Sequence, residues 1–133
     1  MSTSRLLTEP LLVYMQEMII TDQTKKGYRN EIDRYKIYSP YDKYTYYLCK
    51  MTPDEFSRKV QTLIDQLNSS SKSDTDIIVF SKNLLDLHPF KDGNGWTTKL
   101  CMYYLLEDKT NFVKYQYELT RNGYHNHQLI KNI

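Results

Sequence analysis

The chain has 133 residues, which is the length of one domain, since domains take on the order of 100 to 200 residues. Hydrophobic residues make up 40% of it and charged residues 26%, a balance typical of a folded globular protein and not of a disordered chain. The net charge of +2 comes with interspersed signs, which excludes a strong field toward polyanions and predicts no nucleic-acid partner. We therefore expect a single domain over residues 1–133.

The sequence shows no pattern typical of a membrane-spanning helix or of a secretory signal peptide. The longest apolar run, residues 100–106, is far shorter than the roughly 20 residues of a bilayer-spanning helix, and the first ten residues lack a signal-peptide pattern. Cys49 and Cys101 have no metal-type spacing and are predicted to be reduced packing residues. These features predict a cytoplasmic protein without a membrane partner. The chain contains no alanine, a bias expected of an AT-rich genome such as that of a virus or parasite, in which case the compartment is the host cytoplasm.

The first predicted helix begins near Thr8, has Pro10 in its first turn and ends around residues 22–27. Its predicted apolar face carries Leu11, Met15, Met18 and Ile19. Residues 27–47 then become rich in β-favouring side chains, and residues 39–42 supply turn chemistry. This stretch predicts an exposed β-hairpin.

Three further helices are predicted between the hairpin and residue 106. Thr52, Pro53 and Glu55 form a capping signal for a helix that stops at Asn68 and has one apolar face, made of Phe56, Val60, Leu63, Ile64 and Leu67. The next helix starts near Asp74 or Asp76 and ends at His88, because Pro89 disfavours helical geometry there. Another begins near residues 96–98, and the last segment is predicted to be helical over residues 115–119 and 124–130. The fold class is therefore mainly α with a small β element.

The loop at residues 88–95 reads HPFKDGNG. Gly93 and Gly95 permit backbone conformations in which successive N–H groups form an anion-binding nest at a helix start. Asp92 is a hard oxygen ligand suited to Mg²⁺ held together with substrate phosphates, and His88 can accept a proton at neutral pH. Each feature alone is typical of an ordinary helix end or turn, but their contiguity indicates phosphate chemistry. Phe90 is the predicted apolar anchor of the loop.

This loop resembles the signature of the Fic family, which is His, any residue, Phe, any residue, Asp or Glu, Gly, Asn, Gly, Arg, two residues, Arg. The matching positions are His88, Phe90, Asp92, Gly93, Asn94 and Gly95. The resemblance covers roughly residues 6–130: residues 27–38 lie where the family has its target-docking flap, residues 53–67 resemble the helix after it, and Arg121 with Tyr124 resembles a pair near the nucleotide pocket. It implies a Fic/Fido helical core with a small β-hairpin flap.

The resemblance also implies an activity and its residues. A protein nucleotidyltransferase of this kind most often transfers AMP from ATP to a Tyr, Thr or Ser hydroxyl of a target protein (AMPylation). By position, His88 would deprotonate that hydroxyl and Asp92 would hold Mg²⁺, while the phosphates and nucleotide would be bound by Gly93, Asn94, Gly95, Trp96, Lys99 and Tyr124. The target would dock by strand addition on the flap residues Tyr35, Lys36, Ile37 and Tyr38.

Trp96 and Lys99 depart from the signature, because both stand where the family has arginine. Lysine gives a point charge in place of a bidentate fork, and an indole, which either packs in the core or stacks on a base, cannot replace a guanidinium. Two alternatives therefore stay open. One is a Fic-like transferase that uses another donor (UMP, phosphate or phosphocholine), and the other is a catalytically inactive Fic-like binding module.

Three further features bear on regulation and on other sites. The family's inhibitory helix carries Ser or Thr, three residues, then Glu, and none of the glutamates here follows that spacing; restraint would then come from a regulatory partner or be unnecessary. His125 and His127, with His88, could ligate a metal, but a solvated tail is the simpler interpretation. Self-modification would fall on the flap tyrosines Tyr35, Tyr38 and Tyr41.

Overall fold

The computed structural model describes residues 5–30, 34–39, 43–48 and 51–122, with the backbone alone described for the two strands and for residues 120–122. The elements in chain order are α1 (Glu9–Ile19), β1 (Arg34–Ser39), β2 (Lys43–Leu48), α2 (Pro53–Asn68), α3 (Asp74–Leu87), α4 (Asn94–Leu105) and α5 (Phe112–Asn122), with short 3₁₀ turns at Gln23–Lys25 and Lys109–Asn111. The predicted fold class, mainly helical with one small hairpin, is confirmed.

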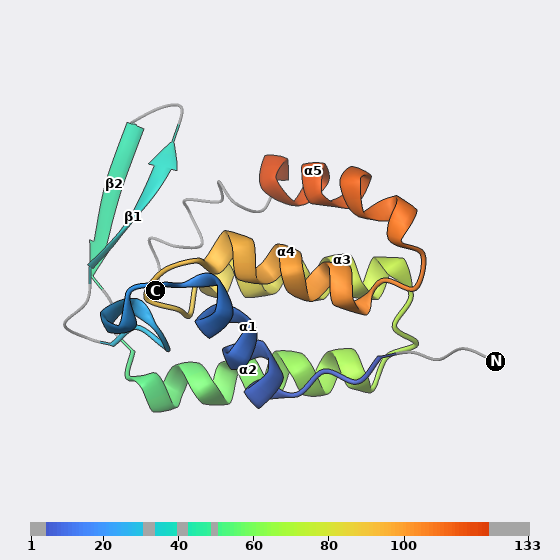
Figure 1. The fold of residues 1–133 in the computed structure, drawn as a ribbon, viewed down its shortest axis with the longest axis horizontal. Coiled ribbons are helices and arrows are strands. Elements are labelled where there is room, and N and C mark those ends of the chain that lie inside the picture. The colour runs from blue at the N-terminus through green and yellow to red at the C-terminus, as the bar shows by residue number, and fades with distance from the viewer. Residues whose placement is uncertain (1–4, 31–33, 40–42, 49–50, 123–133) are drawn as a thin grey trace.

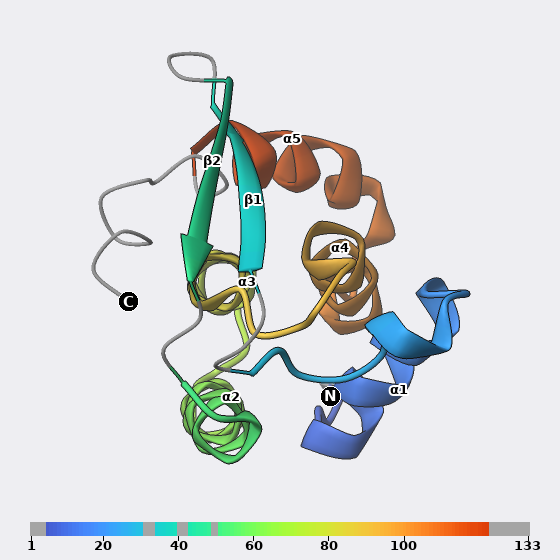
Figure 2. The same cartoon turned by 90° about the vertical axis from the view of Figure 1, so that its left-hand side faces the viewer.

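The helices α3 and α4 lie side by side in the middle of the bundle (Figures 1 and 2). The helix α1 packs against α4, α2 packs against α3, and α5 contacts both central helices. All five helices contribute side chains to one core, which includes Leu12, Val60, Leu84, Met102 and Leu119. The loop between α3 and α4 lies at the end of the bundle that carries the hairpin (Figure 1), so the fold brings the two predicted functional segments to the same end.

The strands β1 and β2 pair antiparallel, in a register that runs from Arg34 opposite Leu48 to Ser39 opposite Lys43. A two-stranded antiparallel sheet therefore forms where the sequence predicts it. The predicted turn residues 40–42 lie outside the described residues. One of the predicted flap segments behaves differently: residues 27–29 do not belong to the hairpin and pair instead with the loop after α3.

The helix α1 is shorter than predicted, and its buried face shares Met15 with the predicted one but is centred differently. It ends at Ile19, and the Asp22 carboxylate then accepts a hydrogen bond from the Thr24 N–H at 3.0 Å, which caps a separate 3₁₀ turn. Met18 is 55% exposed, so its predicted place on the apolar face is wrong. A helical repeat of 3.6 residues instead turns Leu12, Met15 and Gln16 inward, and the polar Gln16 hides this face in a sequence pattern.

The helix α2 begins at the predicted capping signal, and α3 begins at Asp74, one of its two predicted starts. The Thr52 side chain accepts from the Glu55 N–H at 3.2 Å, and the Ser73 side chain accepts from Asp76 in a full capping box. The helix α4 begins at Asn94, earlier than the predicted 96–98. The helix α5 extends the predicted 115–119 segment at both ends, whereas residues 124–130 and Cys49 lie outside the described residues. Cys101 is buried and unpaired, as expected of a packing residue.

Candidate active-site loop

The chain from His88 to Gly93 is held by a short backbone pairing with residues 27–29. The Arg29 N–H donates to the Pro89 carbonyl at 2.9 Å, and the Lys91 N–H donates to the Gly27 carbonyl at 3.0 Å. Between these bonds the Tyr28 ring stacks on the Phe90 ring, with centroids 5.2 Å apart. Phe90 is 1% exposed and belongs to the core. It therefore anchors the loop, as its position in the sequence predicts.

Gln16 joins α1 to the same loop through its buried side-chain amide. Its Nε2 group donates to the Asp92 carbonyl at 3.1 Å and to the Lys25 carbonyl at 3.0 Å, and its Oε1 atom accepts from the Gly27 N–H at 2.9 Å. Each of these partners is a backbone group of an irregular segment. Since buried backbone groups need a partner, one fully buried glutamine supplies bonds that regular secondary structure does not offer here.

Asn94 braces the loop with its side chain. Its Oδ1 atom accepts from the Phe90 N–H and its Nδ2 group donates to the Phe90 carbonyl, both at 2.9 Å. The residue is 5% exposed. Both polar atoms of the side-chain amide are thus bonded within the loop. The group of Asn94 that would make the predicted contact with phosphate is therefore its backbone N–H.

Gly93 is the N-cap of α4 and has a φ of 76°, in the left-handed region. A Cβ atom there would lie 2.8 Å from Ile20 Cδ1, so conformation and space both require glycine. Gly95 differs, because it lies in the first turn of α4 and is not among the described residues of positive φ. The prediction that both glycines adopt special conformations is right for Gly93 only.

The N-terminus of α4 presents backbone donors toward the loop. Asn94, Gly95 and Trp96 occupy the first three helical positions, and N–H groups at these positions have no intrahelical acceptor. They carry the positive end of the helix dipole, which makes this end of α4 suited to an anion. The donor set that the sequence predicts as a nest is therefore mainly a helix N-terminus.

Asp92 precedes this helix and is exposed. Its Oδ1 atom accepts from the Gly93 N–H at 2.8 Å, which fixes the carboxylate beside the helix start. The described residues contain no cluster of three metal-ligating side chains. One carboxylate suits Mg²⁺ when phosphates supply further ligands, so Asp92 fits a metal that arrives with a nucleotide.

His88 ends α3 in a left-handed conformation, with φ 52° and ψ 55°. Burial, together with the nearby Arg29 charge, lowers the pKa of His88 to about 3. The imidazole also hydrogen-bonds to the backbone of Leu85, and since this bond favours the protonated form, the ring is the donor. A neutral imidazole has one N–H. The second ring nitrogen of His88 therefore carries no proton at neutral pH, as a general base requires, but a pKa of about 3 makes this imidazole a weaker base than an ordinary histidine.

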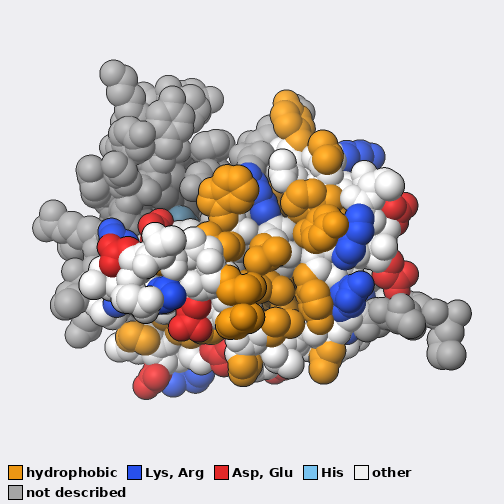
Figure 3. Space-filling model, viewed as in Figure 1, with side chains coloured by type: hydrophobic (Ala, Val, Ile, Leu, Met, Phe, Trp, Pro, Cys, Tyr) orange, Lys and Arg blue, Asp and Glu red, His pale blue; other side chains and the backbone are white. Residues whose placement is uncertain are grey.

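Trp96 is 69% exposed, so the interpretation of this residue as core packing is wrong. The Lys99 ammonium lies 4.9 Å from the centroid of its ring, a separation typical of a cation–π contact. The two residues that stand at the signature's arginine positions thus contact each other one helical turn apart. Figure 3 shows one face of the molecule, on which apolar side chains gather over α1, α4 and α5.

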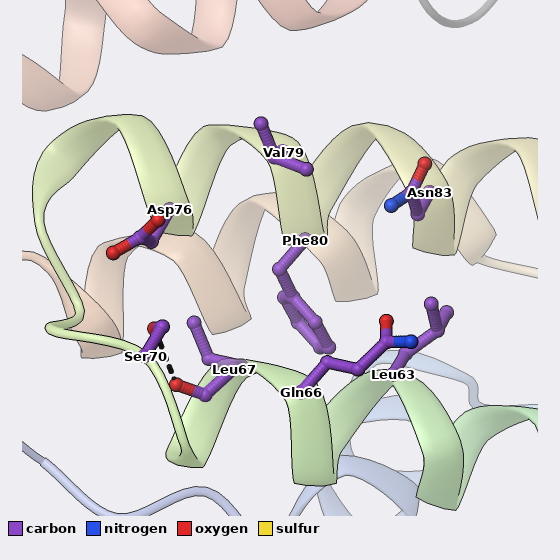
Figure 4. Close-up of a pocket in the computed structure, with 8 residues that line it drawn as sticks. All are labelled: Leu63, Gln66, Leu67, Ser70, Asp76, Val79, Phe80 and Asn83. Carbon is purple, nitrogen blue, oxygen red and sulfur yellow. Dashed lines mark hydrogen bonds between the residues drawn. The ribbon is translucent and has the colours of Figure 1, made fainter.

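Several predicted site residues have side chains that the structure does not describe, so their position relative to the loop is not given. Tyr35, Lys36, Ile37 and Tyr38 lie on β1, of which the backbone alone is described. Tyr41, Tyr124, His125 and His127 lie outside the described residues, as does any site that they would form. A small groove between α2 and α3, lined among others by Leu63, Phe80 and Asn83 (Figure 4), lies nearer the opposite end of α3 from His88 and contributes nothing to the loop.

Gln16 and Arg29 are the site residues that sequence reasoning missed. The available signals are a glutamine on the inward face of a helix, at the spacing of Leu12 and Met15, and an arginine directly after Gly-Tyr in a stretch read as hairpin. Either pattern is too common to identify a loop brace without the fold.

Comparison with protein families agrees with this geometry. The model of the Fic/DOC family matches residues 6–106, which include α1 to α4 and the whole loop. A search of curated proteins and a search of solved structures each gave no match. Among the described residues, no helix is long and apolar enough to cross a membrane. The family match covers most of the chain, and the chain belongs to the Fic/DOC family, a family of transferases.

Proposed function

We propose that this protein is a nucleotidyltransferase that transfers AMP from ATP to a hydroxyl side chain of a target protein. The single observation that carries the proposal is the arrangement of one short loop. A neutral His88 ends one helix, the free end of the next helix offers backbone donors, and the exposed Asp92 carboxylate lies between them. A base, an anion site and a metal carboxylate are thus held on one braced segment.

In the proposed reaction the target hydroxyl oxygen attacks the α-phosphorus of ATP. The new bond joins that oxygen to the α-phosphorus, the bond from the α-phosphorus to the bridging oxygen breaks, and pyrophosphate leaves. His88 takes the hydroxyl proton on the ring nitrogen that does not bond to Leu85. The N–H groups at the start of α4 stabilise the charge that develops on the phosphoryl oxygens.

Asp92 would hold Mg²⁺ against the α- and β-phosphates. When bound, the ion supplies charge neutralisation of the phosphates and fixes their orientation. The bond from the Gly93 N–H to Oδ1 orients the carboxylate, and its other oxygen remains for a cation. The side chain thus needs no movement of the loop to serve as a ligand.

The hairpin is the proposed docking site for the target. The register of β1 and β2 defines a two-stranded sheet, and a two-stranded sheet offers an extended peptide an edge with free backbone donors and acceptors. The hairpin lies at the end of the bundle that holds the loop (Figure 1). A target segment added along it would carry its hydroxyl residue toward His88.

The contact between Trp96 and Lys99 favours a second candidate, a transferase with a different phosphate donor. Lys99 is the cation that the signature positions offer, and it lies over the indole, so the grip on a triphosphate is weaker than two guanidinium groups would give. A donor with fewer phosphates than ATP fits this weaker grip better. A phosphocholine donor fits poorly, because its quaternary ammonium would meet the Lys99 charge at the ring.

The test is intact-mass spectrometry of the purified protein and of a candidate host lysate, after incubation with Mg²⁺ and one donor at a time. ATP, UTP, GTP, CTP, the diphosphates ADP and UDP, and CDP-choline are the donors, and His88→Ala is the matched control. A mass gain of one AMP that requires His88 supports the proposal. A gain of another group identifies the second candidate, and no gain with any donor contradicts a transferase and leaves a Fic-like binding module.

A further inference from the structure

Arg29 is the charged side chain that the fold encloses most completely among the described residues, at 1% exposure. The transfer scheme above gives it no role. Burying a guanidinium is costly unless hydrogen bonds and favourable electrostatics compensate. Its surroundings therefore indicate what the residue does.

Arg29 donates hydrogen bonds to the carbonyls of three successive residues at the end of α3. Its Nη2 group lies 3.3 Å from the Leu87 carbonyl oxygen, its Nε group 2.5 Å from that of His88, and its backbone N–H 2.9 Å from that of Pro89. The last carbonyls of a helix have no intrahelical partner and carry its negative end. The guanidinium supplies the donors to the Leu87 and His88 carbonyls and the opposite charge, while the backbone N–H binds the Pro89 carbonyl.

These bonds hold a backbone conformation that His88 would not adopt readily by itself. A φ of 52° in a residue with a Cβ atom costs on the order of 1–2 kcal/mol and persists only where surrounding contacts enforce it. The Phe56 ring supports the guanidinium from one side, with 4.5 Å between Cζ and the ring centroid. The Arg29 guanidinium is thus fixed by the Phe56 ring and by the His88 carbonyl.

We propose that Arg29 is a positioning residue, which holds His88 in its left-handed conformation and so aims the imidazole at the target hydroxyl. The inference rests on the proposed role of His88 as the base. Lysine keeps the charge but cannot place planar donors on two successive carbonyls. Arg29→Lys should therefore disturb the orientation of His88 more than it disturbs the rest of the protein.

The experiment compares native protein, Arg29→Lys and the matched control Arg58→Lys, in which the exposed Arg58 of α2 undergoes the same chemical change. Thermal unfolding establishes that each variant is folded. NMR of the imidazole ring, assigned with His88→Ala, reports the His88 environment independently of activity. The rate of AMP addition is then measured over a range of ATP concentrations with Mg²⁺ present.

We expect Arg29→Lys to shift the His88 ring resonances and to slow transfer at saturating ATP by about 10- to 100-fold, the range for a misplaced catalytic group. The half-saturating ATP concentration should stay within about twofold of native, because the interactions that bind substrate are unchanged. Arg58→Lys should match native in every measurement. Unchanged His88 resonances, or a loss that appears only in ATP binding, would overturn the proposal.

Two further outcomes separate this inference from the proposed function. If the native protein transfers nothing, the proposed function fails, yet shifted His88 resonances in folded Arg29→Lys still support the positioning role. If Arg29→Lys does not fold, Arg29→Gln, which keeps a neutral donor for the His88 carbonyl, takes its place. Failure of both variants to fold shows that Arg29 acts on stability alone and overturns the proposal.

Discussion

Asn94→Ala should destabilise the fold through the two hydrogen bonds that the Asn94 amide makes to Phe90. The substitution leaves the Phe90 N–H and carbonyl without these partners in a site where Asn94 is 5% exposed and Phe90 1% exposed. Each buried backbone group left unsatisfied costs about 1–3 kcal/mol. For the two groups together we expect a loss of about 2–6 kcal/mol in the free energy of unfolding, the lower value applying if a water enters.

Urea unfolding followed by circular dichroism measures this loss, because helices that share one hydrophobic core are expected to unfold together in two states. Asn83→Ala is the control, since Asn83 is exposed on α3 and should change stability by less than about 0.5 kcal/mol. Asn94→Asp keeps the acceptor for the Phe90 N–H but sets a charged oxygen against the Phe90 carbonyl. Its deficit should be large at pH 7 and smaller at pH 4, where a protonated carboxyl can donate. A native-like stability of Asn94→Ala would refute the bracing role.

Three other predictions follow from the same loop. Gly93→Ala should lower the free energy of unfolding by about 1–3 kcal/mol, because φ is +76° and the new Cβ would lie 2.8 Å from Ile20 Cδ1; equal melting temperatures for variant and native protein would contradict this. Since the folded-state pKa of His88 is lowered to about 3, below its ordinary value of about 6.5, its contribution to stability is complete above pH 6.5 and is lost as the pH falls from there toward 3. Native protein should therefore lose more stability than His88→Ala between pH 7 and pH 5. Asp86, whose pKa burial raises to about 6, is present in both proteins and does not affect this difference. Parallel losses in the two proteins would count against a neutral His88 imidazole. Trp96→Arg should lower the half-saturating ATP concentration roughly tenfold, as a new charge-assisted bond to phosphate would, and an unchanged value in a calorimetric titration would show that this position does not face the nucleotide.

The parts of the fold with strong local signals could be predicted from the sequence. Thr52 and Pro53 mark the start of α2, Pro89 marks the end of α3 near His88, and the β-favouring side chains with the turn residues between them mark the hairpin. Capping and chain stiffness depend on neighbouring residues, so these signals are readable without the fold. The special conformation predicted for both glycines holds for Gly93 alone, because α4 begins at Asn94, earlier than predicted, and takes Gly95 into its first turn.

The braces of the loop could not be predicted, because they depend on contacts between distant segments. Gln16 bonds to Asp92, 76 residues later, and Arg29 bonds to His88, 59 residues later. Both are polar residues whose burial contradicts their usual preference. Trp96 shows the converse, since a large apolar residue at a helix start is expected in the core and is instead exposed beside the predicted nucleotide site.

In the proposed reaction the α-phosphoryl group of ATP, with its nucleoside, moves directly to a protein hydroxyl while His88 takes the hydroxyl proton. The most direct test measures protein-bound label after incubation of the protein and lysate with Mg²⁺ and ATP. The ATP is labelled at either the α- or the γ-phosphate, and native protein is compared with His88→Ala. We predict protein-bound label from α-labelled ATP only, and none with His88→Ala. Label from the γ-phosphate would show phosphoryl transfer instead, and α-label that persists in His88→Ala would contradict the role of His88 as the base.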